Sequence, residues 1–135
     1  MKNLVFLCLL IVGSFASAGQ PITCLKGDGD SIKVLNIYPS GDIVMSFYEA
    51  HITFKKEDIQ RVSSNPSEVS TTEIFSVTNV QAHLAVEGEE SDIPASLVFI
   101  YNPEQKAGRL TVVSEGYTNL RNELFTNCNN NPISE

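Results

Sequence analysis

The segment CLKGDGDS, residues 24–31, places two carboxylates, two glycines and a cysteine within eight positions, as a cation-binding loop would. A calcium loop of the EF-hand kind needs oxygen ligands at alternate positions, a glycine at the sixth and a bidentate acid at the twelfth. Counted from Asp28, the sixth residue is Lys33 and the twelfth is Pro39, so the pattern fails. Asp-Gly is a strong hairpin signal. We therefore predict a turn after a first strand that carries Cys24, and no metal site.

The two histidines, His51 and His83, are the side chains best suited to acid–base or metal chemistry. Alternation of apolar residues places both on the outward face of predicted strands. No HxH, HExxH or CxxC arrangement accompanies them, and no GxSxG elbow occurs. We predict no catalytic residue, no metal ligand and no cofactor. A hydrolase whose triad is assembled only by the fold remains a third hypothesis, and its turnover would depend on His51 or His83.

Four acidic residues lie close together in a predicted hairpin tip: Glu87, Glu89, Glu90 and Asp92. They could bind a cation weakly or dock a partner, but a solvated loop is the favoured interpretation. A catalytic carboxylate pair needs an apolar setting that raises one pKa, and nothing in the sequence selects such a pair here.

The first 18 residues have the form of a secretory signal peptide. Lys2 supplies a positive charge, residues 4–12 form an apolar run, and Ala16 and Ala18 fit the small-x-small cleavage pattern. The apolar run is about half of the ~20 residues that a membrane span needs. We expect cleavage after Ala18, export to the periplasm or medium, and no stable membrane insertion. Removing 18 of the 135 residues leaves 117, numbered 19–135, as a single domain.

Cleavage would leave Cys24 and Cys128 as the cysteines of the mature chain. An even pair in an oxidising compartment predicts a disulfide, and two buried thiols are the alternative. Closing a loop on the order of 100 residues contributes ~4–5 kcal/mol at most. The pair also predicts that the first and last elements are neighbours. Neither Cys8 nor Cys24 directly follows a small-residue box, so lipidation is not expected.

The net charge of the full chain is −7, and loss of Lys2 with the leader makes it −8. This acidity argues against nucleic acid, which is bound by neutralising phosphates, and equally against anionic lipid. A basic partner would be favoured electrostatically. We expect a monomer that binds an unknown protein or envelope partner.

Short β-rich segments separated by turn signals run through the mature sequence. In 43–54 the apolar residues lie at odd positions up to Phe47 and at even positions after it. This change predicts one strand with a β-bulge near Tyr48 and Glu49, or a barrel corner. Ile59 and Val62 are spaced for one helical turn within the polar stretch 55–68. The predicted strands are 31–38, 43–54, 71–78, 80–87, 93–101 and 109–114, with turns at 39–42 and 102–108.

The final segment, 116–128, has two interpretations. Its apolar residues fit helical spacing with Thr118 as a cap, whereas a closing strand is favoured for 123–128. We predict an all-β fold, a small antiparallel meander that closes into a β-barrel or a compact sandwich, with at most one short helix. Residues 93–101 would line the interior, which is either filled by side chains, the favoured version, or open to a small apolar ligand.

This general plan, an exported, acidic, small all-β chain with cysteines near both ends, resembles the periplasmic proteinaceous inhibitors of c-type lysozymes. The resemblance implies a basic enzyme as partner, although no inhibitory loop motif aligns with this sequence. The leading hypothesis is an exported, non-enzymatic binding module. The alternatives are a small-ligand carrier and an inhibitor of a basic enzyme such as lysozyme.

Overall fold

The computed structural model describes residues 21–26, 33–47, 49–63, 72–115 and 119–130. The predicted leader and the predicted Asp-Gly turn lie outside these residues. The elements of the described part are β1 (Ile22–Lys26), β2 (Lys33–Ile37), β3 (Ile43–Phe47), β4 (Ala50–Phe54), the 3-10 helix η2 (Lys56–Asp58), β5 (Gln60–Ser63), β6 (Glu73–Val86), β7 (Glu89–Asn102), β8 (Ala107–Ser114), β9 (Leu120–Phe125) and β10 (Asn127–Asn129).

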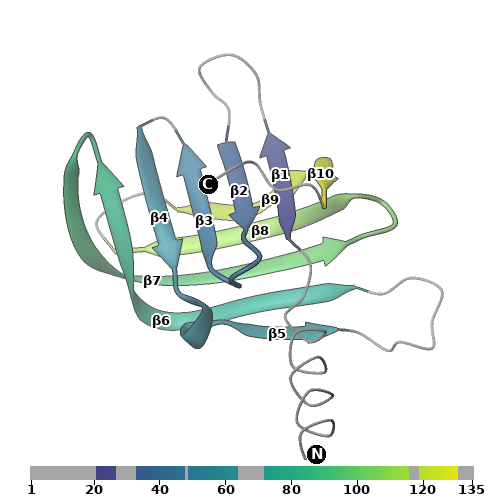
Figure 1. Cartoon of the computed structure of the whole chain (residues 1–135), viewed down its shortest axis with the longest axis horizontal. Coiled ribbons are helices and arrows are strands. Elements are labelled where there is room, and N and C mark those ends of the chain that lie inside the picture. The colour runs from purple at the N-terminus through teal and green to yellow at the C-terminus, as the bar shows by residue number, and fades with distance from the viewer. Residues whose placement is uncertain (1–20, 27–32, 48, 64–71, 116–118, 131–135) are drawn as a thin grey trace, which may run out of the picture.

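All the described strands belong to one antiparallel sheet, ordered β10-β1-β2-β3-β4-β6-β7-β8-β9, with β5 paired to β6. The sheet curls into a nearly closed barrel, as Figure 1 shows. The predicted all-β antiparallel fold is therefore confirmed, and of the two predicted closures the barrel is the one observed. Sequential hairpins account for the topology, because consecutive strands pair along most of the order.

The last stretch of chain closes the barrel. β9 pairs with β8 on one side of the opening, and β10 then pairs with β1 on the other. Cys24 and Cys128 lie directly opposite each other in the β1–β10 ladder and form a disulfide that spans 104 positions of the sequence. The described part of the final segment is thus strand from Leu120 onward rather than helix, and Thr118 lies outside the described residues.

Inward-facing side chains form one contiguous hydrophobic core. On β7 the inward set is Ala95, Leu97, Phe99 and Tyr101, and each is almost fully buried. Phe99 stacks between Phe75 and Tyr101, with ring centroids 6.0 and 5.9 Å away. Only alternate residues of the predicted segment 93–101 face the interior, because strand side chains alternate between the two faces.

Segment 43–54 is a tight hairpin, not one bulged strand. Phe47 pairs with Ala50, so two residues connect β3 to β4. A two-residue connection reverses the chain and turns the apolar residues of both β3 and β4 to the interior. The change from odd to even apolar positions is therefore explained without a bulge. The alternative of a barrel corner is wrong for the same reason.

The short helical turn predicted within 55–68 is present, but it lies earlier than Ile59 and Val62. The 3-10 helix ends at Asp58, and Val62 lies in β5, paired with Ile74 of β6. The predicted strands 71–78 and 80–87 are one strand, β6, interrupted by a register shift between Val77 and Val80. Long-range pairing with β7 keeps β6 continuous, and local sequence pattern does not report that pairing.

Candidate functional site

The acidic hairpin tip is divided by the structure into separate contacts. Glu87 and Gly88 form the turn, both with positive φ, whereas Glu89, Glu90 and Asp92 already belong to β7. The predicted hairpin is confirmed and its four acids are exposed, but they do not share one loop, because the turn consists of Glu87 and Gly88 alone. Positive φ at both turn residues fits the twist of a two-residue hairpin.

His83 faces outward, as predicted, and contacts two of these acids. Its Nε2 atom lies 3.0 Å from a carboxylate oxygen of Glu90, and its Nδ1 atom lies 3.3 Å from one of Asp92. Hydrogen bonding to Glu90, and then to Asp92, raises the pKa of His83 above its usual value of 6.5. His83 is thus a histidine in contact with two carboxylates on the outward face of the sheet, with its side chain 42% exposed.

His51 also faces outward and is paired across strands with Ser46. The Ser46 hydroxyl and the Nδ1 atom of His51 lie 2.7 Å apart. A nucleophile and a base are therefore adjacent, but in the described part of the chain no carboxylate is hydrogen-bonded to the other ring nitrogen of His51. The pair is exposed, so water is not excluded from it and it lacks the third group of a triad.

Two hairpin tips bring Glu49 and Glu87 together. Their carboxyl groups are close enough that hydrogen bonding to Glu87, followed by its negative charge, raises the pKa of Glu49 above its usual value of 4.5. Among the described residues, no three His, Cys, Asp or Glu side chains are arranged to hold a metal ion.

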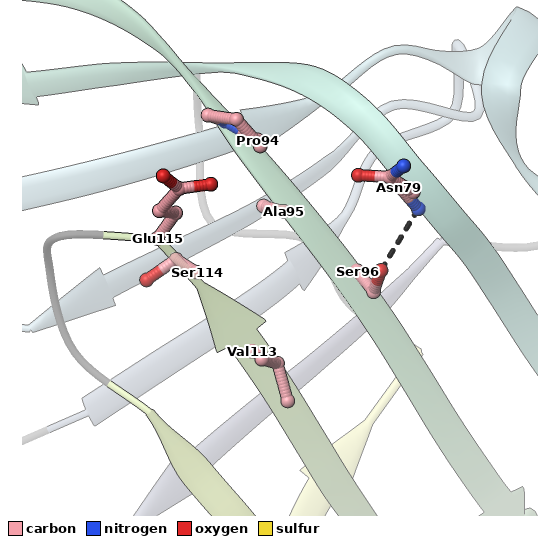
Figure 2. A pocket seen from close by; sticks show the side chains of 7 residues that line it. All are labelled: Asn79, Pro94, Ala95, Ser96, Val113, Ser114 and Glu115. Carbon is pink, nitrogen blue, oxygen red and sulfur yellow. Dashed lines mark hydrogen bonds between the residues drawn. The ribbon is translucent and has the colours of Figure 1, made fainter.

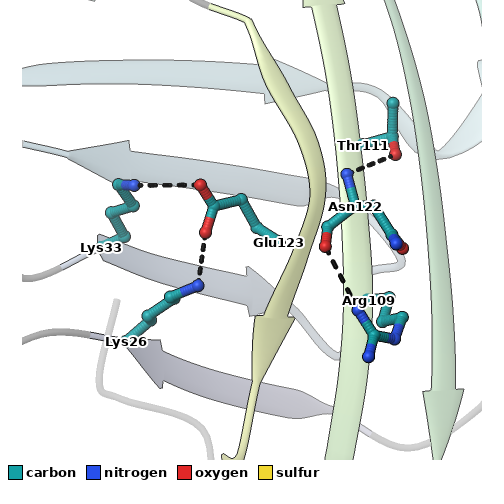
Figure 3. A network of polar contacts seen from close by, with 6 residues as sticks. All are labelled: Lys26, Lys33, Arg109, Thr111, Asn122 and Glu123. Carbon is teal, nitrogen blue, oxygen red and sulfur yellow. Dashed lines mark hydrogen bonds and ion pairs between the residues drawn. The ribbon is translucent and has the colours of Figure 1, made fainter.

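A polar cluster bridges the opening between β1 and β9, as Figure 3 shows. Glu123 faces inward from β9 and forms ion pairs with Lys26 of β1 and, at 3.6 Å, with Lys33 of β2. Lys26 and Lys33 are direct cross-strand neighbours, so the carboxylate balances two like charges. The hydrogen bond from Lys26 is the main reason that the pKa of Glu123 is lowered from 4.5.

A second polar group lies on β5 and β6. Arg61 of β5 binds Glu73 of β6 at 2.8 Å, and its guanidinium lies 4.7 Å from the centroid of the Phe75 ring. Beside them the hydroxyl of Tyr101 is buried and has no hydrogen-bond partner among the described residues. Burial, and secondarily the charge of Glu73, raise the pKa of Tyr101 above 10.0. The aromatic rings beneath this cluster are themselves buried, so the described residues present a packed surface here.

A shallow hollow of about 190 Å³ lies where β6, β7 and β8 meet. Figure 2 shows its lining, which includes Asn79, Pro94, Ser96, Val113 and Glu115. Small-molecule sites usually enclose roughly 300–1,000 Å³, so this hollow suits one side chain rather than a whole ligand.

The most distinctive feature is a concentration of apolar side chains on the outside of the barrel. Of the described residues, the large hydrophobic side chains that are exposed are all on the outward side of β5–β9: Val62, Ile74, Val98, Ile100, Val113 and Leu124. Their exposed fractions run from 36% for Ile74 to 57% for Val62. We call these six residues the apolar outer face.

Strand register makes this face continuous. Val62 pairs with Ile74, and Ile74 pairs with Ile100. The same row continues through Arg109 to Leu124. Directly opposed residues have Cβ atoms about 4.5–5.5 Å apart, so these side chains touch across the sheet. A contiguous apolar surface of this kind marks an interaction site more often than scattered exposed residues do.

The sequence did not predict this face. Val98 and Ile100 belong to the most apolar segment of residues 19–135, which the sequence predicts to line the interior. A signal for this face was present in the sequence, because apolar residues occupy both alternating sets of positions in this segment. A strand with one face in water would have polar residues at every second position.

The chain matches no protein-family model, no curated protein and no solved structure. Its described residues include no helix of the length and apolarity that a membrane crossing requires. The fold and surface define a disulfide-closed, antiparallel β-barrel with an apolar outer face.

Proposed function

We propose that this protein is an exported, non-enzymatic binding module that engages a protein of the envelope or the surrounding medium through its apolar outer face. One observation carries the proposal: the exposed large hydrophobic side chains of the described chain lie on one continuous sheet surface. Burying apolar surface is the main favourable term in most protein association, so this surface is the one that gains most from a partner.

The compartment is consistent with this role. The Cys24–Cys128 disulfide fits an oxidising, extracytoplasmic location. We propose export to the periplasm or the medium, directed by the signal-like residues 1–18. The exposed, outward-facing positions of His51 and His83 support a non-enzymatic role, since an exposed group does not by itself hold a substrate in a fixed orientation.

Site-specific photocrosslinking tests the proposal. A benzophenone side chain at position 98 or 100 should trap a partner in envelope or culture-fluid fractions of the source cells. Position 44 is the matched control, because Val44 faces outward on β3, away from β5–β9.

An adduct that forms at 98 and 100, is absent at 44, and is competed by unlabelled protein would support the proposal. Unlabelled Ile100→Asp protein should compete poorly. Identical adducts at all three positions, or full competition by Ile100→Asp, would rule out this face as the binding surface.

A further inference from the structure

We infer that the partner segment bound by the apolar outer face combines apolar side chains with a carboxylate that pairs with Arg109. This inference rests on the proposed function and specifies the chemistry of the partner. It opposes the simplest reading of the net charge of −7, which favours a basic partner.

Arg109 occupies the interior of the apolar row. It lies between Ile100 of β7 and Leu124 of β9, and its side chain is exposed. Its Nη1 atom donates a long hydrogen bond, 3.4 Å, to the carbonyl oxygen of Asn122 (Figure 3). A guanidinium carries five donors, so most of its hydrogen-bonding capacity faces outward.

Half of the described lysines and arginines take part in ion pairs, and Arg109 belongs to the other half. Lys26 and Lys33 share Glu123, Lys55 faces Asp42, and Arg61 binds Glu73. Lys56, Lys106, Arg109 and Arg121 are exposed and form no ion pair with another described residue. Of these four, Arg109 is the one that lies within the apolar row itself, between Ile100 and Leu124.

A carboxylate-bearing partner satisfies both properties of the surface. Apolar contacts would cover Val98, Ile100 and Leu124, and the desolvated guanidinium would then need an anionic acceptor. Arginine–carboxylate pairs are frequently bidentate and fix the register of the bound segment. An uncompensated buried arginine would instead oppose binding by a purely apolar or basic partner.

A protein segment fits this surface better than a membrane or a second copy. The apolar side chains are β-branched or leucine on a sheet and are about half exposed, without the protruding aromatic residues typical of interfacial anchors. A chain of net charge −7 is also repelled by anionic lipid. Two-fold pairing of identical faces would oppose Arg109 of one copy to the same positive surface of the other.

Peptide selection followed by charge reversal tests the inference. A random phage-displayed library of about 12 residues per peptide would be panned on the disulfide-bonded protein. Ile100→Asp protein would serve for counter-selection. The enriched peptides should combine apolar residues with Asp or Glu. Fluorescence anisotropy should then show at least about tenfold weaker binding to Arg109→Glu protein, because a charge-assisted pair is replaced by repulsion.

A peptide whose acid is changed to lysine should bind Arg109→Glu protein more tightly than wild type. Lys55→Glu is the matched control for charge, since Lys55 is 59% exposed and lies outside the apolar outer face. It should leave the affinity within about twofold.

The outcomes separate the inference from the proposed function. If the peptides fail to bind Ile100→Asp protein but bind Arg109→Glu protein as tightly as wild type, the carboxylate pairing is overturned and the binding face is retained. Selection of no Ile100-dependent peptide, together with failed crosslinking, would overturn both. Cosedimentation with phosphatidylglycerol vesicles that Arg109→Glu abolishes would assign the face to a membrane, and a concentration-dependent dimer abolished by Ile100→Asp would assign it to a second copy. Either result would overturn the inference.

Discussion

Glu123 shows how one residue compensates for hydrogen bonds that the backbone does not make. Where the barrel closes, β9 and β1 lie near each other without forming a ladder of hydrogen bonds. β9 pairs with β8, and the edge of β1 pairs with β10. The carboxylate of Glu123 spans this gap to Lys26 and Lys33. Without it, two lysines would face each other across β1 and β2, which is unfavourable for like charges.

Replacement of Glu123 by glutamine should lower the free energy of unfolding at pH 7 by about 1 kcal/mol, a value limited by partial exposure to solvent. The pKa of Glu123 is lowered in the folded state, so its contribution is present above pH 4.5, the usual value, and is lost as pH falls through the lower folded pKa. Urea unfolding of both proteins across pH 3–7 should show the difference shrinking below about pH 4.5.

Glu104→Gln is the control, since Glu104 is exposed in the turn between β7 and β8. A Glu123→Gln deficit that stays constant with pH would show that the ion pairs are not its cause.

Gly108 permits the close contact between β8 and the aromatic stack. A Cβ atom at this position would lie 2.5 Å from Cε1 of Phe99 and 3.0 Å from the carbonyl oxygen of Ile100. Gly108→Ala should therefore destabilise the fold by about 1–3 kcal/mol through overpacking. Denaturant titration measures this cost, and combining Gly108→Ala with Phe99→Leu should recover part of it. The assigned clash would be contradicted if the double variant lost as much free energy of unfolding as the two single variants together, or more.

At the scale of elements, two β-bulges are built in the same way. Each bulge has an asparagine with positive φ, Asn79 in β6 and Asn122 in β9. Each asparagine donates its backbone N–H to a hydroxyl on the neighbouring strand, Asn79 to Ser96 at 2.8 Å and Asn122 to Thr111 at 3.0 Å. Asparagine tolerates the left-handed conformation better than most residues, and the hydroxyl replaces a lost ladder partner.

The bulges affect the binding surface because they increase local twist and interrupt the rows of outward side chains. The Asn79 bulge adjoins the hollow at the end of the apolar outer face, shown in Figure 2. The Asn122 bulge lies beside Arg109, whose guanidinium contacts the Asn122 carbonyl.

Replacing either asparagine by valine should cost about 1–2 kcal/mol, because a β-branched residue is strained at positive φ. Asparagine to glycine at the same sites should be close to neutral. Thermal unfolding of the four variants measures both effects. If glycine and valine destabilise equally, side-chain contacts rather than backbone conformation explain the choice of asparagine.

At the scale of the whole molecule, the barrel is held closed by its last few residues. β10 contributes three residues to the ladder with β1, and Cys128 also donates its backbone N–H to the Lys106 carbonyl at 3.1 Å. The covalent link therefore secures an element that is too short to stabilise the seam by itself. Its separation of 104 positions makes nearly the whole described chain one closed loop.

Cys24→Ser with Cys128→Ser should lower the free energy of unfolding by up to about 4–5 kcal/mol, with loop-closure entropy as the reason. Urea unfolding of the double variant and of wild type, each with and without reductant, measures the loss. Reductant should destabilise wild type only. Wild-type protein whose unreduced cysteines react with an alkylating agent after denaturation would show that the disulfide is absent in solution.

The sequence by itself determined the class of fold and the link between its ends. Period-two alternation in 80–87 and frequent turn signals predicted antiparallel β structure, because side chains of a strand alternate between buried and solvated faces. Cys24 and Cys128 predicted a first and a last element that approach each other, which a closing sheet provides.

Only the tertiary structure decided which residues share a surface. The hairpin at 43–54, the continuity of β6 and the inward position of Glu123 depend on pairing between strands, and pattern within one segment does not report pairing. The apolar outer face is assembled from five strands that span Val62 to Leu124. Its residues are distant in sequence and adjacent through register, so their proximity and the position of Arg109 among them appear only once the sheet is formed.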